Sequence, residues 1–378
     1  MKTQWKDRPV GEILRLEYGK PLDDLDRKPD GLYTVYGANG EKDRSDKFYF
    51  DRPSIIVGRK GSAGEVNLTE GKFWPLDVTY FVTFDERQHE LRFLYYLLTT
   101  LDLPSLAKGI KPGINRNEVY SRVTKIPSLP EQQRIVRILD EAFDGLATAT
   151  ANAEQNLRNA RALFESHLQL VFTQRGEGWA IIQLADVCER LHQGLNTAGE
   201  KIKFYDSGYP IIQTRNIDDG VIELDSKIKF MCEDDWQLYR DKYRPELGDV
   251  FFTNIGTIGK TAIVTVDLDY LIHWNIFKLR PCLKMITSEF LRYTLEQLTL
   301  SGYFEKLQKG GTVDFVTKKM ISEALIYLPS IAEQKRIVAT LDSLRKETQR
   351  LESIYQQKLA ALGELKKSLL HRAFSGEL

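Results

Sequence analysis

The sequence predicts an α/β (α+β) protein with two similar mixed domains, each followed by a long helix, and two observations support this fold class. The segment Ile126–Val136 (IPSLPEQQRIV) returns in similar form as Leu328–Val338 (LPSIAEQKRIV). Each copy opens a run with few Gly or Pro residues, in which apolar side chains recur at spacings of three and four. Solenoid units are only about 20–50 residues long, so we interpret this longer repeat as a duplicated domain with its helix.

The duplication extends upstream of both helices. Three matched features keep their order in the two copies: Trp5 and Trp179, the glycine turns Gly61–Gly64 and Gly256–Gly259, and the segments Phe93–Tyr96 and Phe290–Tyr293. Short apolar runs rich in β-branched and aromatic residues lie between Gly, Asp and Asn, which predicts strands within each domain. We therefore expect a first domain at 1–125, a central helical spacer at 126–175, a second domain at 176–327 and a C-terminal helical spacer at 328–378.

Both long helices have a clear start signal. Ser128 with Glu131, and Ser330 with Glu333, match the S-x-x-E capping box. Each helix should run for about 42 residues, or roughly 60 Å at 1.5 Å per residue. One such helix cannot bury its apolar stripe alone, and the first helix carries the chain from one domain to the other. We therefore expect an antiparallel coiled coil that holds the domains at most about 60 Å apart, or about 18 base pairs of B-DNA. The alternative is two helices packed within one globular core.

Composition limits the class of protein. The 378-residue chain has a formal net charge of zero, which argues against a simple polycationic coat for nucleic acid but allows local basic surfaces. Cys188, Cys232 and Cys282 are too far apart for a disulfide framework or a zinc site, so we expect reduced thiols in a cytoplasmic protein. No secretory leader and no apolar stretch of about 20 residues is present, so we expect no membrane span.

Signals for catalysis are weak. Gly259-Lys260-Thr261 invites comparison with a phosphate-binding loop, but that motif needs Gly where Asn254 stands, so a turn between strands is the better interpretation. No Asn-Pro-Pro-aromatic or Asp-Pro-Pro-Tyr tetrapeptide of an amino-methyltransferase occurs, and the histidines have no metal-ligand spacing. We therefore assign no catalytic residue and no metal ligand.

Basic and amide side chains occupy matching places in the two copies. The candidates in the first copy are Asn39, Arg59, Lys60, Ser62, Lys108, Lys111, Asn115 and Arg116. Those in the second copy are Arg215, Asn216, Asn254, Thr257, Lys260, Lys309, Thr312, Lys318 and Lys319. Such side chains bind phosphates and read base edges in double-stranded DNA. Because the framework is shared and the residues differ, the two domains would read two different half-sites.

The doubled motif resembles a known family. Pro-Ser-x-x-Glu-Gln-x-Arg-Ile-Val before a long helix, present twice, is similar to the specificity (S) subunit of type I restriction-modification systems. The closing segment His371–Leu378 and the aromatic-Gly-x-Asn-Gly element at Tyr36–Gly40 are also typical of that family. The sequence departs from the pattern at Ala332, where Pro is frequent, and at Gln213–Asn216, which stands where the first copy has its Gly-Ala-Asn-Gly.

The resemblance implies two target-recognition domains and no catalytic activity in this chain. It also implies that the helices dock two methyltransferase (M) subunits, with restriction (R) subunits joining through the complex. S-adenosylmethionine, ATP and Mg²⁺ would then belong to the partner subunits. The candidate docking residues lie at the starts of the two helices: Glu131, Gln132, Arg134, Glu333, Gln334 and Arg336.

Other classes stay open from the sequence alone. The first is a coiled-coil scaffold that makes no contact with DNA, and the second is an NTPase that uses Gly259-Lys260-Thr261. A DNA-reading subunit of a modification-only or fused nuclease system is a further variant. DNA binding with a steep dependence on salt would distinguish recognition from a scaffold.

Overall fold

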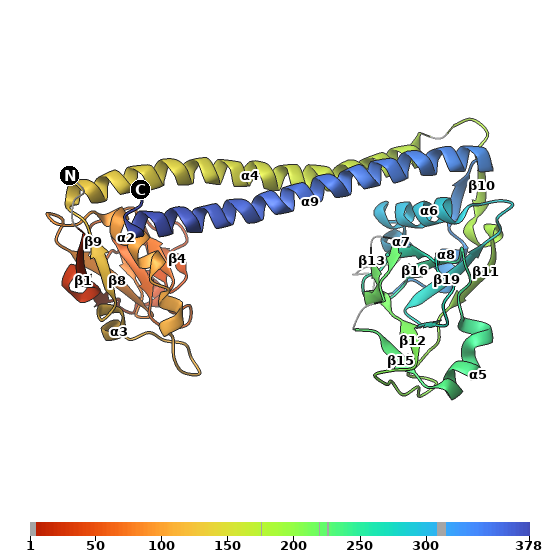
Figure 1. Ribbon diagram of the computed structural model, residues 1–378, viewed down its shortest axis with the longest axis horizontal. Helices are drawn as coiled ribbons and strands as arrows, with labels where there is room; N and C mark the ends of the chain where they lie inside the picture. The colour runs from red at the N-terminus through yellow and green to blue at the C-terminus, as the bar shows by residue number, and fades with distance from the viewer. Residues whose placement is uncertain (1–4, 175, 219, 225–226, 308–314) are drawn as a thin grey trace. The chain divides into compact units, whose positions relative to one another are not determined.

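The computed structural model describes residues 5–174, 176–218, 220–224, 227–307 and 315–378. The chain divides into two compact units (Figure 1). Unit 1 comprises Met1–Glu154 with Gln356–Leu378, and unit 2 comprises Gln155–Tyr355. The long helices α4 (Leu129–Thr173) and α9 (Ile331–Ser375) each contribute to both units. Each unit therefore contains one mixed α/β domain together with part of each helix.

The domain of unit 1 contains three small sheets. The antiparallel four-stranded sheet has the order β2 (Leu14–Tyr18), β8 (Thr79–Phe84), β5 (Ile55–Gly58) and β6 (Val66–Leu68). The three-stranded sheet has the order β4 (Gly40–Ser45), β3 (Tyr33–Gly37) and β7 (Phe73–Pro75), with β3 and β7 parallel. The two-stranded sheet pairs β1 (Lys6–Pro9) with β9 (Val123–Ile126). Short helices join these strands: α1 (Val10–Ile13), η1 (Asp24–Asp26), α2 (Leu91–Thr100), η2 (Leu103–Leu106) and α3 (Arg116–Tyr120).

The domain of unit 2 repeats this topology strand for strand. Its four-stranded sheet has the order β11 (Cys188–Gln193), β19 (Ile276–Pro281), β16 (Val250–Thr253) and β17 (Thr261–Ile263). Its three-stranded sheet has the order β15 (Lys229–Met231), β12 (Tyr209–Ile212) and β18 (Leu271–Ile272), and the third sheet pairs β10 (Ala180–Gln183) with β20 (Leu325–Leu328). The helices are η3 (Leu184–Val187), η4 (Thr214–Asn216), α6 (Ser288–Leu300), α7 (Tyr303–Leu307) and α8 (Lys318–Ser322). The prediction of two similar α/β domains is therefore confirmed.

Two insertions distinguish the second domain from the first. One is the hairpin of β13 (Ile217–Asp218) and β14 (Val221–Ile222), which lies against β17 through a bridge between Gly220 and Ala262. The other is α5 (Glu233–Tyr243), whose Trp236 stacks flat on Tyr209 with ring centroids 4.7 Å apart. Both insertions add surface to one copy while the common set of strands is retained.

The long helices pack into the core of each domain. In unit 1, Ile135 and Leu139 of α4 and Ala373 of α9 are buried in the same apolar cluster as Phe93 and Leu94 of α2. In unit 2, the corresponding cluster joins side chains from α4, α6 and α9: Phe164, Leu168, Phe290, Leu291, Ile337 and Leu341. Burial of these side chains supplies most of the stability of such an arrangement.

The two helices run antiparallel within each unit. In unit 1, Arg134 Nη2 donates to the carbonyl of Leu378, and further along α4 the ring of Phe143 lies 5.3 Å from Lys366 Nζ. In unit 2, Arg161 pairs with Glu352 at 2.9 Å. There Arg345 Cζ also lies 4.1 Å from the ring centroid of Phe164. Residue numbers on α9 fall as those on α4 rise, so the antiparallel prediction is confirmed.

The helix starts follow the sequence signal with two corrections. Helices α4 and α9 begin directly after the predicted cap residues and run for 45 residues each, slightly longer than expected. Ser330 Oγ accepts from the backbone N–H of Glu333 at 3.3 Å, as in a capping box. At the start of α4 the predicted side-chain bond is wrong, because the backbone N–H of Glu131 donates to the carbonyl of Ser128 at 2.9 Å instead. The other bond of the capping box, in which the glutamate carboxylate accepts from the backbone N–H of the serine, was predicted wrongly. The Glu333 carboxylate binds Arg336 at 2.6 and 2.9 Å instead, and the Glu131 carboxylate binds Arg134 at 2.7 and 2.9 Å. Among the described helices, none is both long and apolar enough to cross a membrane.

Candidate nucleic-acid interface

Three segments of the first domain meet around the glycine turn between β5 and β6. Gly61 N–H donates to the carbonyl of Pro112 at 2.9 Å, and Ile114 N–H donates to the carbonyl of Arg59 at 3.0 Å. A Cβ added at Gly58 would lie 2.6 Å from the carbonyl oxygen of Ala38, so the β3–β4 turn also lies against this site. We name residues 38–40, 58–64 and 108–116 loop cluster 1. It brings together all of the first-domain candidates: Asn39, Arg59, Lys60, Ser62, Lys108, Lys111, Asn115 and Arg116.

Two guanidinium groups of this cluster lie against one tyrosine. The centroid of the Tyr18 ring is 5.3 Å from Arg59 Cζ and 4.9 Å from Arg116 Cζ. Arg59 also donates from Nε and Nη2 to the carbonyl of Asp77, at 3.0 and 2.6 Å. These contacts hold the arginines in a fixed position at the surface. Tyr18 could not be recognised as a site residue from the sequence, because its proximity to both arginines depends on the pairing of β2 with β8.

The other candidates of loop cluster 1 differ in their exposure and in their bonding partners. Lys60 and Lys111 are exposed. Lys108 is exposed too, but its ammonium group pairs with Glu118 at 2.6 Å. Asn115 caps α3, because its side chain accepts from the backbone N–H of Asn117 at 2.9 Å. Its first role is therefore structural, whereas Lys60 and Lys111 present charge to solvent.

The second domain builds the same glycine turn from different residues. Gly61 and Gly64 have φ values of 80° and 88°, and the corresponding Gly256 and Gly259 have 79° and 91°. These left-handed values favour glycine. The backbone bonds match as well, because Gly64 N–H donates to the carbonyl of Gly58 and Gly259 N–H donates to that of Thr253. The two copies therefore share the backbone conformation of this turn and differ in the side chains that it carries.

The glycine turn of the second domain is not a nucleotide-binding loop. A phosphate-binding loop continues into a helix whose first turn carries the Ser or Thr. Here Thr261 begins strand β17, and Lys260 Nζ pairs with Asp218 at 2.8 Å. The NTPase alternative for this segment is therefore wrong.

Neighbouring segments also converge on the second turn. Val316 N–H donates to the carbonyl of Asn254 at 2.9 Å, as Ile114 does to Arg59 in the first domain, and Thr214 Oγ1 donates to the carbonyl of Ile255 at 3.3 Å. We name residues 213–216, 253–260 and 315–319 loop cluster 2. Its exposed candidates are Arg215, Thr257, Lys318 and Lys319. Lys309 and Thr312 lie outside the described residues.

Two candidates of loop cluster 2 are buried. Asn216 and Asn254 are each 1% exposed. Asn216 Oδ1 accepts from the backbone N–H of Gln213 at 3.1 Å, which closes the turn of η4. Asn254 Oδ1 has no hydrogen-bond partner among the described residues. Both side chains therefore lie beneath the surface of the cluster.

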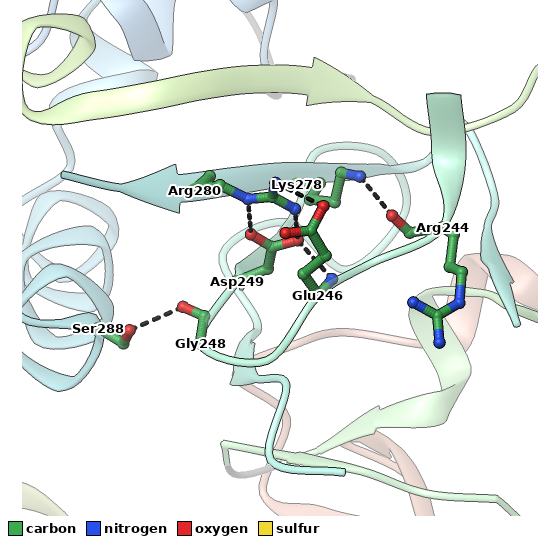
Figure 2. Close-up of polar contacts among 7 residues, drawn as sticks. All are labelled: Arg244, Glu246, Gly248, Asp249, Lys278, Arg280 and Ser288. Carbon is green, nitrogen blue, oxygen red and sulfur yellow. Dashed lines mark hydrogen bonds and ion pairs between the residues drawn. The ribbon is translucent and has the colours of Figure 1, made fainter. Parts of the chain in front are cut away.

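A buried ionic network supports the strand that leads into this turn (Figure 2). Asp249 is 1% exposed and accepts from Arg280 Nε and Nη2 at 2.8 and 3.0 Å, while Glu246 pairs with Arg280 at 2.6 Å. Lys278 Nζ donates to the carbonyl of Arg244 at 2.7 Å. The hydrogen bond to Asp249 raises the pKa of Arg280, and burial lowers the pKa of Lys278. The network ties the segment before β16 to β19 and so fixes the strand that ends in loop cluster 2.

Comparison with known proteins identifies the family. The model of the type I restriction modification DNA specificity domain matches residues 2–157 and again residues 176–360. This chain belongs to the type I restriction-modification specificity family. A putative type I specificity subunit of Haemophilus influenzae is 25% identical over 365 residues, which cover 92% of this chain and 89% of that protein. The EcoBI specificity subunit of Escherichia coli is 24% identical over 326 residues, which cover 79% of this chain and 68% of that protein.

Solved structures show the same fold. A chain from a structure of a type I restriction-modification system covers 100% of both chains with a TM-score of 0.78 and 19% identity. The HsdS subunit of Thermoanaerobacter tengcongensis covers 99% of this chain and 97% of that chain, with a TM-score of 0.58 and 20% identity. Specificity subunits are non-catalytic, and the enzymatic activities of these systems belong to partner subunits.

Each long helix of this specificity subunit is fastened to its own domain by a buried glutamine. Gln132 is 0% exposed, and its amide donates to the carbonyls of Gln88 and Pro127 while accepting from Glu90 N–H. Gln334, also 0% exposed, makes the equivalent bonds to Met285, Pro329 and Thr287. The two predicted docking glutamines therefore form no part of any described surface. The only sign of these glutamines in the sequence is that a Glu-Gln pair occurs at the start of both helices.

A tyrosine on the neighbouring helix adds a second fastening in each specificity domain. Tyr96 Oη donates to Asp140 at 2.5 Å, and Tyr293 Oη donates to Asp342 at 2.5 Å. Burial raises the pKa of each tyrosine to about 12, with a further contribution from its carboxylate partner. Both phenols are therefore protonated donors at neutral pH. The remaining docking candidates form ion pairs on the helix surface, where Arg336 is more exposed (71%) than Arg134 (36%).

Proposed function

We propose that this specificity subunit reads a two-part DNA target, with loop cluster 1 contacting one half-site and loop cluster 2 the other. The observation that carries the proposal is the shared glycine turn. The same backbone presents Arg59, Lys60 and Ser62 in one domain, whereas in the other it presents Ile255 and Thr257 and buries Asn254. One framework with two sets of side chains suits two different base sequences.

The candidates divide by the kind of contact that they can make. Lys60 and Lys111 carry exposed ammonium groups, which suit contacts to phosphates. In loop cluster 2, Arg215, Lys318 and Lys319 are exposed and suit phosphates or base edges. The buried asparagines of that cluster would keep its shape.

An exchange of domains tests the two-part target. Residues 1–125 would be replaced by the same region of another specificity subunit, and the methylated sequence would be mapped at base resolution in cells that also carry the partner subunits. We expect one half of the target to change while the other half is retained. A change in both halves, or in neither, would contradict the proposal.

Charge reversal tests the phosphate contacts. In the complex with methyltransferase subunits, Lys60→Glu combined with Lys111→Glu should weaken DNA binding and reduce the slope of log K against log salt by about two, one for each lost contact. Lys125→Glu is the matched control, since Lys125 is exposed on β9 of the same domain but outside loop cluster 1. Fluorescence anisotropy across a salt series measures both values. An unchanged slope in the double variant would favour a scaffold that makes no contact with DNA.

We also propose that two methyltransferase subunits bind at the starts of α4 and α9. The two sites are similar, because Glu131 with Arg134 and Glu333 with Arg336 form the same ion pair in the first turns of each helix. They differ in that Arg134 also donates to Leu378 and is less exposed than Arg336. Restriction subunits would join through that complex. S-adenosylmethionine, ATP and Mg²⁺ would be bound by these partners rather than by this chain.

Native mass spectrometry of the assembled complex tests the docking sites. Arg336→Glu should reduce the complex from two methyltransferase subunits to one, because it places a second negative charge beside Glu333. Arg350→Glu is a closely matched control, since Arg350 forms the same kind of ion pair with Glu347 further along α9. Equal stoichiometry for both variants would place the docking surface elsewhere.

A further inference from the structure

The loop between η2 and α3 has a tip that is clamped at its base. Lys108 and Gly113 exchange two backbone hydrogen bonds, at 3.0 and 3.1 Å. Gly109 has a φ of 93°, which a residue with a side chain rarely adopts. The carbonyl of Pro112 accepts from Gly61 N–H, so the tip is also fastened to the glycine turn of loop cluster 1. Four residues, from Gly109 to Pro112, therefore project from a fixed base.

Ile110 at this tip is completely exposed. Its exposed fraction is 106%, so the folded chain covers no more of it than an extended reference chain would. Ile is stiff at χ1 because it is branched at Cβ. Its apolar side chain contributes nothing to the core, and its branching limits the number of χ1 rotamers that it can adopt.

The charges around Ile110 suggest what covers it. An isolated exposed apolar residue is ordinary, as with Leu25, which is 93% exposed between Asp24 and Asp26. Ile110 instead lies directly before the exposed Lys111 and two residues after Lys108, whose ammonium group pairs with Glu118, on a clamped loop of the cluster that we assign to DNA. An apolar tip flanked by cations suits a duplex, which offers stacked bases between two lines of phosphates.

We propose that Ile110 is a wedge that enters the DNA from the minor groove and partly separates one base step within the first half-site. This inference rests on the proposed DNA-reading function. Proteins that bend DNA use Ile, Leu, Phe or Met in this way, with cations holding the adjacent phosphates. Pyrimidine–purine steps unstack most readily, so the wedge would favour TA or CA at one position without any hydrogen bond to a base.

The test uses the complex of this chain with its methyltransferase subunits and a duplex that carries the mapped target. The fluorescent base 2-aminopurine is placed at each position of the first half-site in turn, and end-labelled duplexes report bending by energy transfer. We expect binding to raise the fluorescence at one step and to shorten the distance between the ends. Ile110→Ala should abolish both signals and weaken binding about tenfold, while Ile110→Leu should retain them.

Controls separate the wedge from the function on which it rests. Leu25→Ala should leave both signals unchanged. If Ile110→Ala binds and bends the duplex as the unaltered chain does, the wedge is refuted, although DNA reading still stands. If Ile110→Ala instead loses a methyltransferase subunit in native mass spectrometry, the loop contacts a protein and the wedge is refuted. If DNA affinity does not respond to Lys60→Glu with Lys111→Glu, the proposed function itself fails.

Discussion

The buried glutamine at the start of α4 offers a direct test of how helix and domain are joined. Gln132→Ala removes an amide that bonds the carbonyls of Gln88 and Pro127 at 3.1 and 3.0 Å and accepts from Glu90 N–H at 3.0 Å. Glu90 is the N-cap residue of α2, so the amide joins the first turn of α4 to the first turn of α2. In the variant, three backbone groups would lose their partner in a site that is buried only in part.

The size of the effect follows from those three bonds. A typical intramolecular hydrogen bond contributes about 0.5–1.5 kcal/mol, and an unsatisfied buried group costs about 1–3 kcal/mol. We therefore expect Gln132→Ala to lower the free energy of unfolding of unit 1 by about 2–4 kcal/mol. Gln133→Ala is the matched control: the residue type is the same, the position is the next along the helix, and the side chain is exposed. Such surface changes shift stability by about 0.5 kcal/mol or less.

Hydrogen exchange measured for each peptide shows which of the two units has lost stability. The amide of Glu90 loses its acceptor in Gln132→Ala, so the peptide that contains it should exchange faster by the factor that corresponds to the lost free energy. Peptides of unit 2 should be unchanged, and Gln334→Ala should reverse the pattern. The reasoning would be refuted if Gln132→Ala and Gln133→Ala exchanged alike, or if both units responded to one substitution.

Three further predictions concern other parts of the chain. Gly363→Ala should raise the midpoint of urea unfolding by the equivalent of about 0.5–1 kcal/mol, because an added Cβ meets no described atom within 4 Å on α9, and a lower midpoint would contradict this. Asp249→Asn should lower stability by about 2–4 kcal/mol, because it leaves Arg280 partly unpaired in a buried site, whereas Asp267→Asn, with a side chain that is 59% exposed, should cost less than about 1 kcal/mol. Burial raises the pKa of Cys188 to about 12, with a smaller contribution from a neighbouring cysteine, so its thiolate is scarce at pH 8. Mass spectrometry should find iodoacetamide labelling of Cys188 slow at that pH, and rapid only after unfolding or near pH 12.

The elements that were predictable depend on local or periodic signals. The helix starts follow from Pro and Ser residues close together in sequence, and the antiparallel pairing follows from the apolar spacing together with the order of the domains. The duplicated topology was predictable because both copies keep their glycine turns. These features can be predicted without knowing which strands pair.

The site was only partly predictable, because its details depend on strand register. Lys278 is buried, yet it occupies the position on β19 that Phe81 occupies on β8, as the pairing of each with the central strand of its sheet shows. Nothing in the local sequence indicates that a lysine stands in the second copy where the first has a phenylalanine. The asparagines of loop cluster 2 were expected at the surface because polar residues usually lie there, whereas Asn216 closes a turn and Asn254 lies beneath one.

The discontinuous make-up of unit 1 has a consequence for synthesis of the chain. Unit 2 is a single stretch that is complete once Tyr355 has been translated, but unit 1 still waits for the final turns of α9. Those turns place Ala373 in the apolar core of the first domain and pack the partly buried Leu369 and Leu370 against it. Loss of residues 356–378 would therefore damage the first domain and leave all residues of unit 2 in place.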